Sequence, residues 1–180
     1  MCWALAPSPG GYNVLNMATP VNTLSRSESA LWFLGTLTFV KSAGETGAFC
    51  LIEQLLPPGF ATPYHVHHLE DEAFYILEGE LAVVSDSKWQ KVGPGAYIFA
   101  PREIPHGIKV EGNSPARVLI LCAPAGFEQF VIEMSEPAAQ LTLPPPAAPD
   151  MAKLMALAAK YQIDILGPLP EPAGGPARTD

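Results

Sequence analysis

The chain has 180 residues, of which 48% are hydrophobic and 16% charged, and it carries a formal net charge of −8. This length and composition predict one globular domain with its own core and argue against a disordered acidic chain. The negative charge also argues against nucleic acid or an anionic membrane as a partner, because both would repel it, and its basic residues occur singly.

The N-terminal residues show no targeting or membrane signal. They lack the basic and apolar segments of a signal peptide, and no apolar run approaches the ~20 residues of a membrane helix. The three cysteines, Cys2, Cys50 and Cys122, are widely spaced, which favours a cytoplasmic protein without disulfides and a packing role for Cys50 and Cys122. Residues 1–27 are expected to form a flexible extension, with Met1 and Met17 as alternative translation starts.

Residues 28–135 are expected to form an all-β domain. Short segments rich in aromatic and β-branched residues alternate with Gly and Pro turns. No helical segment separates them, so we expect antiparallel strands that close into a sandwich or barrel. The predicted strands cover residues 30–40, 47–56, 72–84, 96–100 and 117–123.

The C-terminal part has a different pattern. Residues 127–136 predict two helical turns after Gly126, and residues 136–170 predict a Pro-rich linker followed by a helix that Asp150 caps. We expect the apolar stripe of this helix to pack on the body of the protein or on a neighbouring subunit, and residues 171–180 to be disordered. The stripe consists of Met151, Leu154, Met155, Ala158 and Tyr161.

All four histidines fall within one metal-ligand pattern. His65 and His67 are two positions apart, so both side chains point to the same face of a strand, whereas His68 points to the opposite face. A carboxylate follows at Glu72, and His106 comes from a later strand. Three nitrogens and one oxygen form a set that first-row transition metals accept.

The spacing of these residues resembles the two motifs of the cupin superfamily. The first motif runs from Gly59 through His65, His67 and Glu72 to Gly79 and is complete. The second begins at Gly95 and places Pro101 and His106 in register. Glu103 stands there at the usual glycine position and Val110 at the usual asparagine position.

The resemblance implies a cupin jelly-roll β-barrel, also called a double-stranded β-helix, with a short C-terminal helical extension. It implies one divalent transition metal per chain, which is iron, manganese, nickel or copper, with zinc also possible. By position in the motifs, the ligands are His65, His67, Glu72 and His106, and His68 matches no ligand.

The sequence around the motifs resembles the bacterial single-domain cupins grouped with quercetin 2,3-dioxygenases. That resemblance implies cleavage of a flavonol, or of a related enolisable aromatic compound, by O₂ with release of carbon monoxide. Glu72 would take the proton of the substrate hydroxyl. Three alternatives remain open: diketone cleavage, sugar isomerisation, and non-catalytic binding of a small ligand.

Several strand residues near the ligands are candidates for the wall of a substrate pocket, and cupin barrels commonly pair as homodimers. Acidic residues elsewhere are expected to be solvated, and the motif spacing selects Glu72 over its neighbours Glu70 and Asp71. The pocket candidates are Tyr64, Phe74, Ile76, Tyr97, Phe99 and Ile108, and the solvated charges are Glu70, Asp71, Glu78, Glu80 and Glu103.

Overall fold

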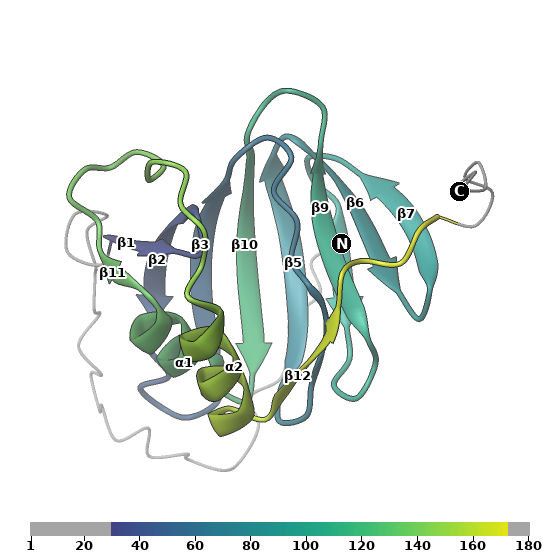
Figure 1. Cartoon of the computed structure of the whole chain (residues 1–180). Helices are drawn as coiled ribbons and strands as arrows, with labels where there is room; N and C mark the ends of the chain where they lie inside the picture. The colour runs from purple at the N-terminus through teal and green to yellow at the C-terminus, as the bar shows by residue number, and fades with distance from the viewer. Residues whose placement is uncertain (1–29, 173–180) are drawn as a thin grey trace, which may run out of the picture.

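Two antiparallel sheets lie face to face in the computed structural model, which describes residues 30–172 (Figure 1). The expected N-terminal extension, residues 1–27, and most of the expected disordered tail, residues 173–180, lie outside the described range. The predicted all-β jelly roll with a helical extension is confirmed. No helix within the described range is long and apolar enough to cross a membrane.

The larger sheet has seven strands in the order β11-β1-β2-β3-β10-β5-β8. Every pairing in it is antiparallel, as expected for strands joined without crossover helices. Its strands are β1 (Ala30–Phe33), β2 (Thr36–Ser42), β3 (Cys50–Leu56), β5 (Asp71–Glu78), β8 (Tyr97–Ala100), β10 (Ala116–Ala123) and β11 (Glu136–Pro137).

The smaller sheet has five strands in the order β12-β4-β9-β6-β7. Two of them, β4 and β9, carry the three histidines of the predicted ligand set. Its strands are β4 (Tyr64–His67), β6 (Glu80–Ser85), β7 (Lys88–Val92), β9 (His106–Glu111) and β12 (Ile163–Gly167).

The core lies between the sheets and consists of side chains at alternate strand positions. On β10, Val118, Ile120 and Cys122 point inward and are buried, and Cys122 faces Cys50 across the β3–β10 pair. The buried position of Cys50 and Cys122 agrees with the packing role predicted for them. The hydrogen bond with Cys50 and the burial both raise the pKa of the Cys122 thiol, which keeps it protonated.

Gly79 explains why the first motif ends in glycine. Its φ is 81°, and a Cβ at this position would lie 2.7 Å from the backbone of Ala116. Only glycine satisfies both requirements without strain, so the β5–β6 turn places β6 in register with β9.

Both predicted helices are present, as α1 (Phe127–Met134) and α2 (Met151–Lys160), and they lie side by side in Figure 1. The side chain of Asp150 accepts a hydrogen bond from Lys153 N at 2.9 Å, which confirms the predicted cap. The buried stripe of α2 is narrower than predicted. Leu154 and Ala158 are buried, but Met151 and Met155 remain about half exposed.

The C-terminal segment contributes more than the predicted linker and helix. After α2, residues 163–167 form β12, which pairs with β4 and becomes an edge of the smaller sheet. Figure 1 shows the chain continuing from β12 across this sheet toward β7. The side chain of Leu169 packs against Gly107 on β9. The C-terminal segment is therefore part of the sandwich rather than an appendage.

Candidate metal centre

Three strands bring the four predicted ligands together. His65 and His67 lie on β4, Glu72 is near the start of β5, and His106 begins β9. His65 and His106 are direct register partners in the β4–β9 pair, so their side chains point the same way. The two-residue spacing on β4 then adds His67 on the same face.

The ligand atoms are close enough to share one ion. The four residues offer one atom each, and these atoms all lie within 4.8 Å of one another. Metal–ligand bonds of about 2.1 Å place ligand atoms about 3 to 4.2 Å apart, so a small inward movement suffices. His67, Glu72 and His106 are buried, and His65 is partly buried.

Hydrogen bonds orient all three imidazoles through Nδ1. His65 Nδ1 donates to the carbonyl of Pro63 at 2.8 Å, and His106 Nδ1 donates to that of Ile104 at 2.9 Å. A carbonyl oxygen only accepts, so the proton lies on Nδ1 in both rings. This tautomer leaves Nε2 to act as a metal ligand.

The third imidazole has a charged partner. His67 Nδ1 lies 2.9 Å from Glu70 Oε1, and both side chains are buried. Glu70 is only 3% exposed, so the prediction that it is a solvated loop charge is wrong. The turn after β4 folds the Glu70 carboxylate back under the His67 ring, three residues along the chain, a proximity that the spacing alone did not indicate.

The electrostatics of the cluster favour a cation. Burial alone would raise the pKa of Glu72, but the hydrogen bond from His106 and the charges of the nearby imidazoles lower it to about 2. Burial and the neighbouring His106 and His67 lower the pKa of His65 to about 3, so this ring is neutral at neutral pH. An ionised carboxylate beside a neutral imidazole suits a divalent metal.

A proton links the remaining pair of ligands. His106 Nε2 lies 2.9 Å from Glu72 Oε2, and His67 Nε2 lies 3.8 Å from the same oxygen. Burial alone would lower the pKa of His106, but the hydrogen bond to Glu72 raises it above its ordinary value. A divalent metal would replace this proton, because His106 Nε2 and Glu72 Oε2 would then both bind the ion.

His68 lies outside the cluster, as the strand alternation predicted. Its Nδ1 is 2.8 Å from Glu103 Oε2, and its Nε2 is 3.0 Å from Asp164 Oδ2 on β12. These hydrogen bonds, first to Asp164 and then to Glu103, raise the pKa of His68. His68 therefore connects β4 to β12 and to the loop before β9.

Glu103 occupies the motif position where glycine is usual, and its backbone keeps the glycine conformation. Its φ is 66°, and its amide donates to the carbonyl of His67 at 2.8 Å. The positive φ costs about 1 kcal/mol in a residue with a Cβ. The departure at Val110 has a simpler basis, because Val110 is buried in the core.

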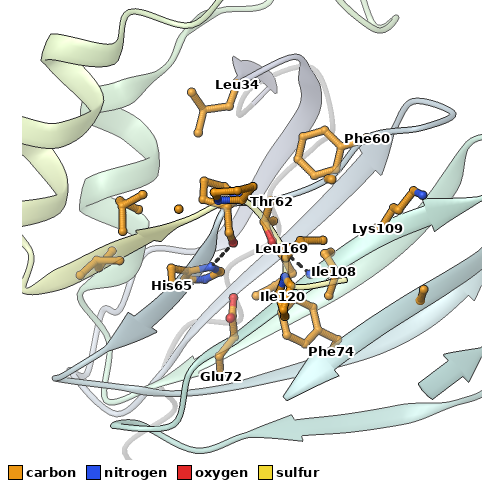
Figure 2. A pocket seen from close by; sticks show the side chains of 18 of the residues that line it. Leu34, Phe60, Thr62, His65, Glu72, Phe74, Ile108, Lys109, Ile120 and Leu169 are labelled. Atoms are coloured by element: carbon orange, nitrogen blue, oxygen red, sulfur yellow. Dashed lines mark hydrogen bonds between the residues drawn. The ribbon is translucent and has the colours of Figure 1, made fainter. Parts of the chain in front are cut away.

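A cavity of about 1150 Å³ opens beside the cluster, and three of the four ligands, His65, His67 and Glu72, line it. Figure 2 shows His65 and Glu72 at one end of it, with Leu34 and Phe60 at the other. Inward side chains of both sheets and both helices form most of its wall, which is largely apolar. The apolar wall residues include Phe33, Phe60, Phe74, Ile108, Ile120, Phe127, Phe130, Leu154, Ile163 and Ile165.

The predicted pocket residues are placed in two groups. Phe74 and Ile108 line the cavity. Ile76 points inward but is fully buried in the core and is not among the residues that line the cavity. The hydroxyl of Tyr64 accepts a hydrogen bond from Ser87 N, and its side chain does not line the cavity either.

Tyr97 and Phe99 do not line the cavity, and this part of the prediction is wrong. They are 66% and 53% exposed, and they pair with Tyr75 and Ala73 on β5. Glu72 and Phe74 occupy the alternate, inward positions of β5, opposite Ala100 and Ile98. Tyr97 and Phe99 therefore occupy the outward-facing positions of β8, and Ile98 and Ala100 occupy the inward-facing ones.

The C-terminal part of the chain supplies wall residues that the sequence reasoning missed. Ile163 and Ile165 pair with His67 and His65 across β12 and β4, and both line the cavity. The ring of Phe127 on α1 packs edge-on against His67, with centroids 5.1 Å apart. The alternating Ile-Asp-Ile sequence after α2 was the available signal for a strand.

Comparisons with known proteins agree with this geometry. Residues 52–122 match a family model described as "Cupin domain". An uncharacterised protein of Methanocaldococcus jannaschii is 35% identical over 74 residues, which cover 41% of this chain and 59% of that protein. Quercetin 2,3-dioxygenase of Bacillus subtilis is 26% identical over 91 residues, which cover 51% of this chain and 27% of the enzyme.

A solved structure also shares the fold. The polyketide cyclase RemF from Streptomyces resistomycificus aligns with a TM-score of 0.51 and 26% identity. The alignment covers 58% of this chain and 80% of that one. Against the two curated relatives, by contrast, the chain spans about three fifths and about a quarter of their lengths.

Proposed function

Because the chain belongs to the cupin superfamily through residues 52–122, we propose that it is a metal-dependent dioxygenase. Its substrate would be a flavonol or a related enolisable aromatic compound, cleaved by O₂. The observation that carries this proposal is a cluster of three histidines and one carboxylate that opens into a large apolar cavity. The likeness to quercetin 2,3-dioxygenase of Bacillus subtilis supports it.

His65, His67, Glu72 and His106 would hold one divalent transition metal. The donor set fits, because three imidazoles present Nε2 and Glu72 presents an ionised oxygen. Four protein ligands leave one or two positions for substrate on a five- or six-coordinate ion. When bound, the metal would supply Lewis acidity toward an enolate oxygen and an electronic route between the electron-rich substrate and O₂.

Glu72 is the group we propose to accept the hydroxyl proton of the substrate. Its Oε2 contacts both His106 and His67, and Oε1 takes part in neither contact. A carboxylate that binds a metal through one oxygen can receive a proton on the other without leaving the site. Burial alone would raise the pKa of Glu72, but the hydrogen bond from His106 and the neighbouring imidazoles lower it, so its carboxylate is ionised at neutral pH.

The wall of the cavity favours an aromatic substrate over a sugar. Aromatic rings from Phe60, Phe74 and Phe127 line it, and such surfaces bind flat apolar molecules by burial and ring packing. A sugar phosphate would require several buried cations, whereas the two lysines that line the cavity, Lys91 and Lys109, are both exposed, and Lys91 is paired with Glu111. We therefore favour cleavage of an aromatic substrate over isomerisation of a sugar as the reaction of this protein.

Turnover tests the proposal directly. Protein loaded separately with Fe²⁺, Mn²⁺, Ni²⁺, Cu²⁺ or Zn²⁺ would be mixed with quercetin, and O₂ consumption and carbon monoxide release would be followed together. We expect one O₂ consumed and one carbon monoxide released per quercetin, because both oxygen atoms enter the opened product. Quercetin binding without O₂ consumption under every metal would contradict the proposal.

A second candidate is a non-oxidative reaction, or binding only, with an aromatic polyketide-like enol. The likeness to the polyketide cyclase RemF favours it, because that structure shares the fold above 25% identity. The same turnover experiment separates the two. Product formation in the absence of O₂, or tight binding without turnover when O₂ is supplied, would identify the second candidate, whereas turnover that depends strictly on O₂ would exclude it.

The proposed partners are the small aromatic substrate, O₂ and a second copy of the chain. An apolar surface of Tyr75, Tyr97, Phe99 and Leu121 lies on the outer face of neighbouring strands β5, β8 and β10. It contains no charged side chain, so two copies that each carry −8 could meet there without placing like charges in contact.

The reduced Cys50–Cys122 pair is consistent with a cytoplasmic compartment.

A further inference from the structure

Gln54 is a buried polar side chain on the inner face of the larger sheet. It lies on β3, opposite Thr38 on β2 and Val118 on β10. It is only 5% exposed, yet it lines the same cavity as His65 and Glu72. A buried amide beside an apolar cavity requires partners for its polar atoms.

A chain of hydrogen bonds fixes which way the Gln54 amide points. Thr36 Oγ1 donates to the carbonyl of Phe33 at 2.7 Å, and the hydroxyls of Thr36 and Thr38 lie 2.9 Å apart. Each hydroxyl has one proton, and Thr36 uses its proton in the bond to Phe33. Thr38 must therefore donate to Thr36, and toward Gln54 its hydroxyl oxygen can only accept. The atom of Gln54 that lies 3.2 Å from Thr38 Oγ1 must therefore be the amide nitrogen.

This orientation turns the carbonyl oxygen of Gln54 away from Thr38. Within residues 30–172, no hydrogen-bond donor contacts Gln54 Oε1. The two threonine hydroxyls cannot serve, because the chain to the Phe33 carbonyl uses both of their protons. Gln54 thus presents a pre-oriented acceptor without a partner at the wall of the cavity.

The acceptor is far from the metal ligands, on the same inward face. Cys122 pairs with Glu72 and Val118 pairs with Gln54, so the two residues are four positions apart along the strands and two strands apart across the sheet. At about 3.3 Å per residue and 4.8 Å per strand, their Cα atoms are about 16 Å apart. Phe74 and Ile120 line the cavity on the rows between them.

We infer that Gln54 is a specificity-determining residue that accepts a hydrogen bond from a hydroxyl group at the end of the substrate remote from the metal centre. The inference rests on the proposed function and narrows its substrate class. The preferred ligand is a planar aromatic compound with enolic oxygens at one end and a phenolic hydroxyl at the other. Apolar walls alone discriminate such compounds weakly, whereas an oriented acceptor discriminates against a compound that lacks the hydroxyl.

Binding to the zinc-loaded protein tests this inference without turnover. The two probes are 3-hydroxyflavone and 3,4′-dihydroxyflavone, which differ only in the distal hydroxyl, and each Kd is measured by fluorescence titration. We expect the wild-type protein to bind 3,4′-dihydroxyflavone about tenfold more tightly. Gln54→Leu should reduce this ratio to about one, chiefly by weakening binding of the hydroxylated probe.

Two further variants control for packing. Ile120→Val alters the cavity wall without changing a polar group. It should therefore weaken the binding of both probes equally and leave the ratio of their Kd values unchanged. Gln54→Met removes the acceptor but keeps the length of the side chain, and it replaces Gln54→Leu if circular dichroism shows that the leucine variant is not folded. Both Gln54 variants should give the same ratio.

The possible results separate this inference from the proposed function. Equal affinity of the wild-type protein for both probes, or a tenfold ratio that persists in both Gln54 variants, would overturn the role of Gln54. O₂-dependent turnover of quercetin would stand in either case. Failure of the wild-type protein to bind either probe would overturn both proposals.

Discussion

Each imidazole of the metal centre is held by a hydrogen bond at Nδ1, but the three acceptors differ in charge. Pro63 and Ile104 offer neutral carbonyls, whereas Glu70 offers a carboxylate to His67. A carboxylate partner increases the electron density on the opposite nitrogen of the ring more than a carbonyl does. His67 is therefore the imidazole whose ligand strength depends most on a residue outside the ligand set.

Replacing Glu70 by Gln should weaken metal binding by about 10- to 100-fold, because the charged partner of His67 is lost. Competition with a chelator of known affinity would measure the change. Glu103→Gln provides the matched control, since Glu103 pairs with the exposed His68 and should leave metal affinity unchanged. Equal effects of the two substitutions would contradict the positioning role of Glu70.

For single residues, the sequence predicted the four metal ligands but not the residues that surround and orient them. The ligands follow from strand alternation and motif spacing, which are local properties. Glu70 was expected to be solvated, and Tyr97 and Phe99 were expected to face inward, because neither the turn after β4 nor the facing of β8 is encoded in spacing alone. Those features depend on how the sheets pack.

Among the elements, β12 connects the C-terminal segment to the metal centre. It pairs with β4, and its inward side chains Ile163 and Ile165 lie beside His67 and His65. Asp164 on the opposite face bonds to His68. The helix α2 was predictable from its cap and its apolar stripe, but a five-residue strand beyond it gave only a weak alternating signal.

Substituting Ile163 by Ala should lower the free energy of unfolding by about 2 to 5 kcal/mol, because a buried side chain leaves a cavity beside His67. Denaturant unfolding monitored by circular dichroism would measure it. Leu166→Ala on the same strand is the control, since Leu166 is exposed and should change stability by less than about 0.5 kcal/mol. Similar losses in both variants would show that β12 does not pack as described.

For the whole molecule, the metal is expected to couple folding to ligand binding. The four ligands come from three strands in two sheets, so an unfolded chain does not present them together. At a free metal concentration of about 1,000 times Kd, binding adds about 4 kcal/mol to the free energy of unfolding. For a chain of this size that corresponds to a rise in Tm of about 8 to 16 °C.

Calorimetry of the protein with and without EDTA would measure this shift. The His106→Ala variant is the control, and its Tm should not respond to EDTA because it lacks one ligand. A Tm of the wild-type protein that is equally insensitive to chelation would contradict the coupling of folding to metal binding.

The apolar surface of Tyr75, Tyr97, Phe99 and Leu121 leads to a prediction about assembly. Phe99→Glu places a charge on this surface, so it should convert a dimer into a monomer. Sedimentation velocity would show the change. Leu166→Glu, which adds the same charge on the other sheet, should leave the dimer intact, and a wild-type protein that sediments as a monomer would contradict the proposed homodimer.

The central claim is that His65, His67, Glu72 and His106 hold one metal and that His68 does not. Elemental analysis of the purified wild-type protein and of His106→Ala and His68→Ala, each reconstituted with the same metal, tests it most directly. The structure predicts about one metal per chain in the wild-type protein and in His68→Ala, and almost none in His106→Ala. Full metal content in His106→Ala, or loss of metal in His68→Ala alone, would contradict the assignment.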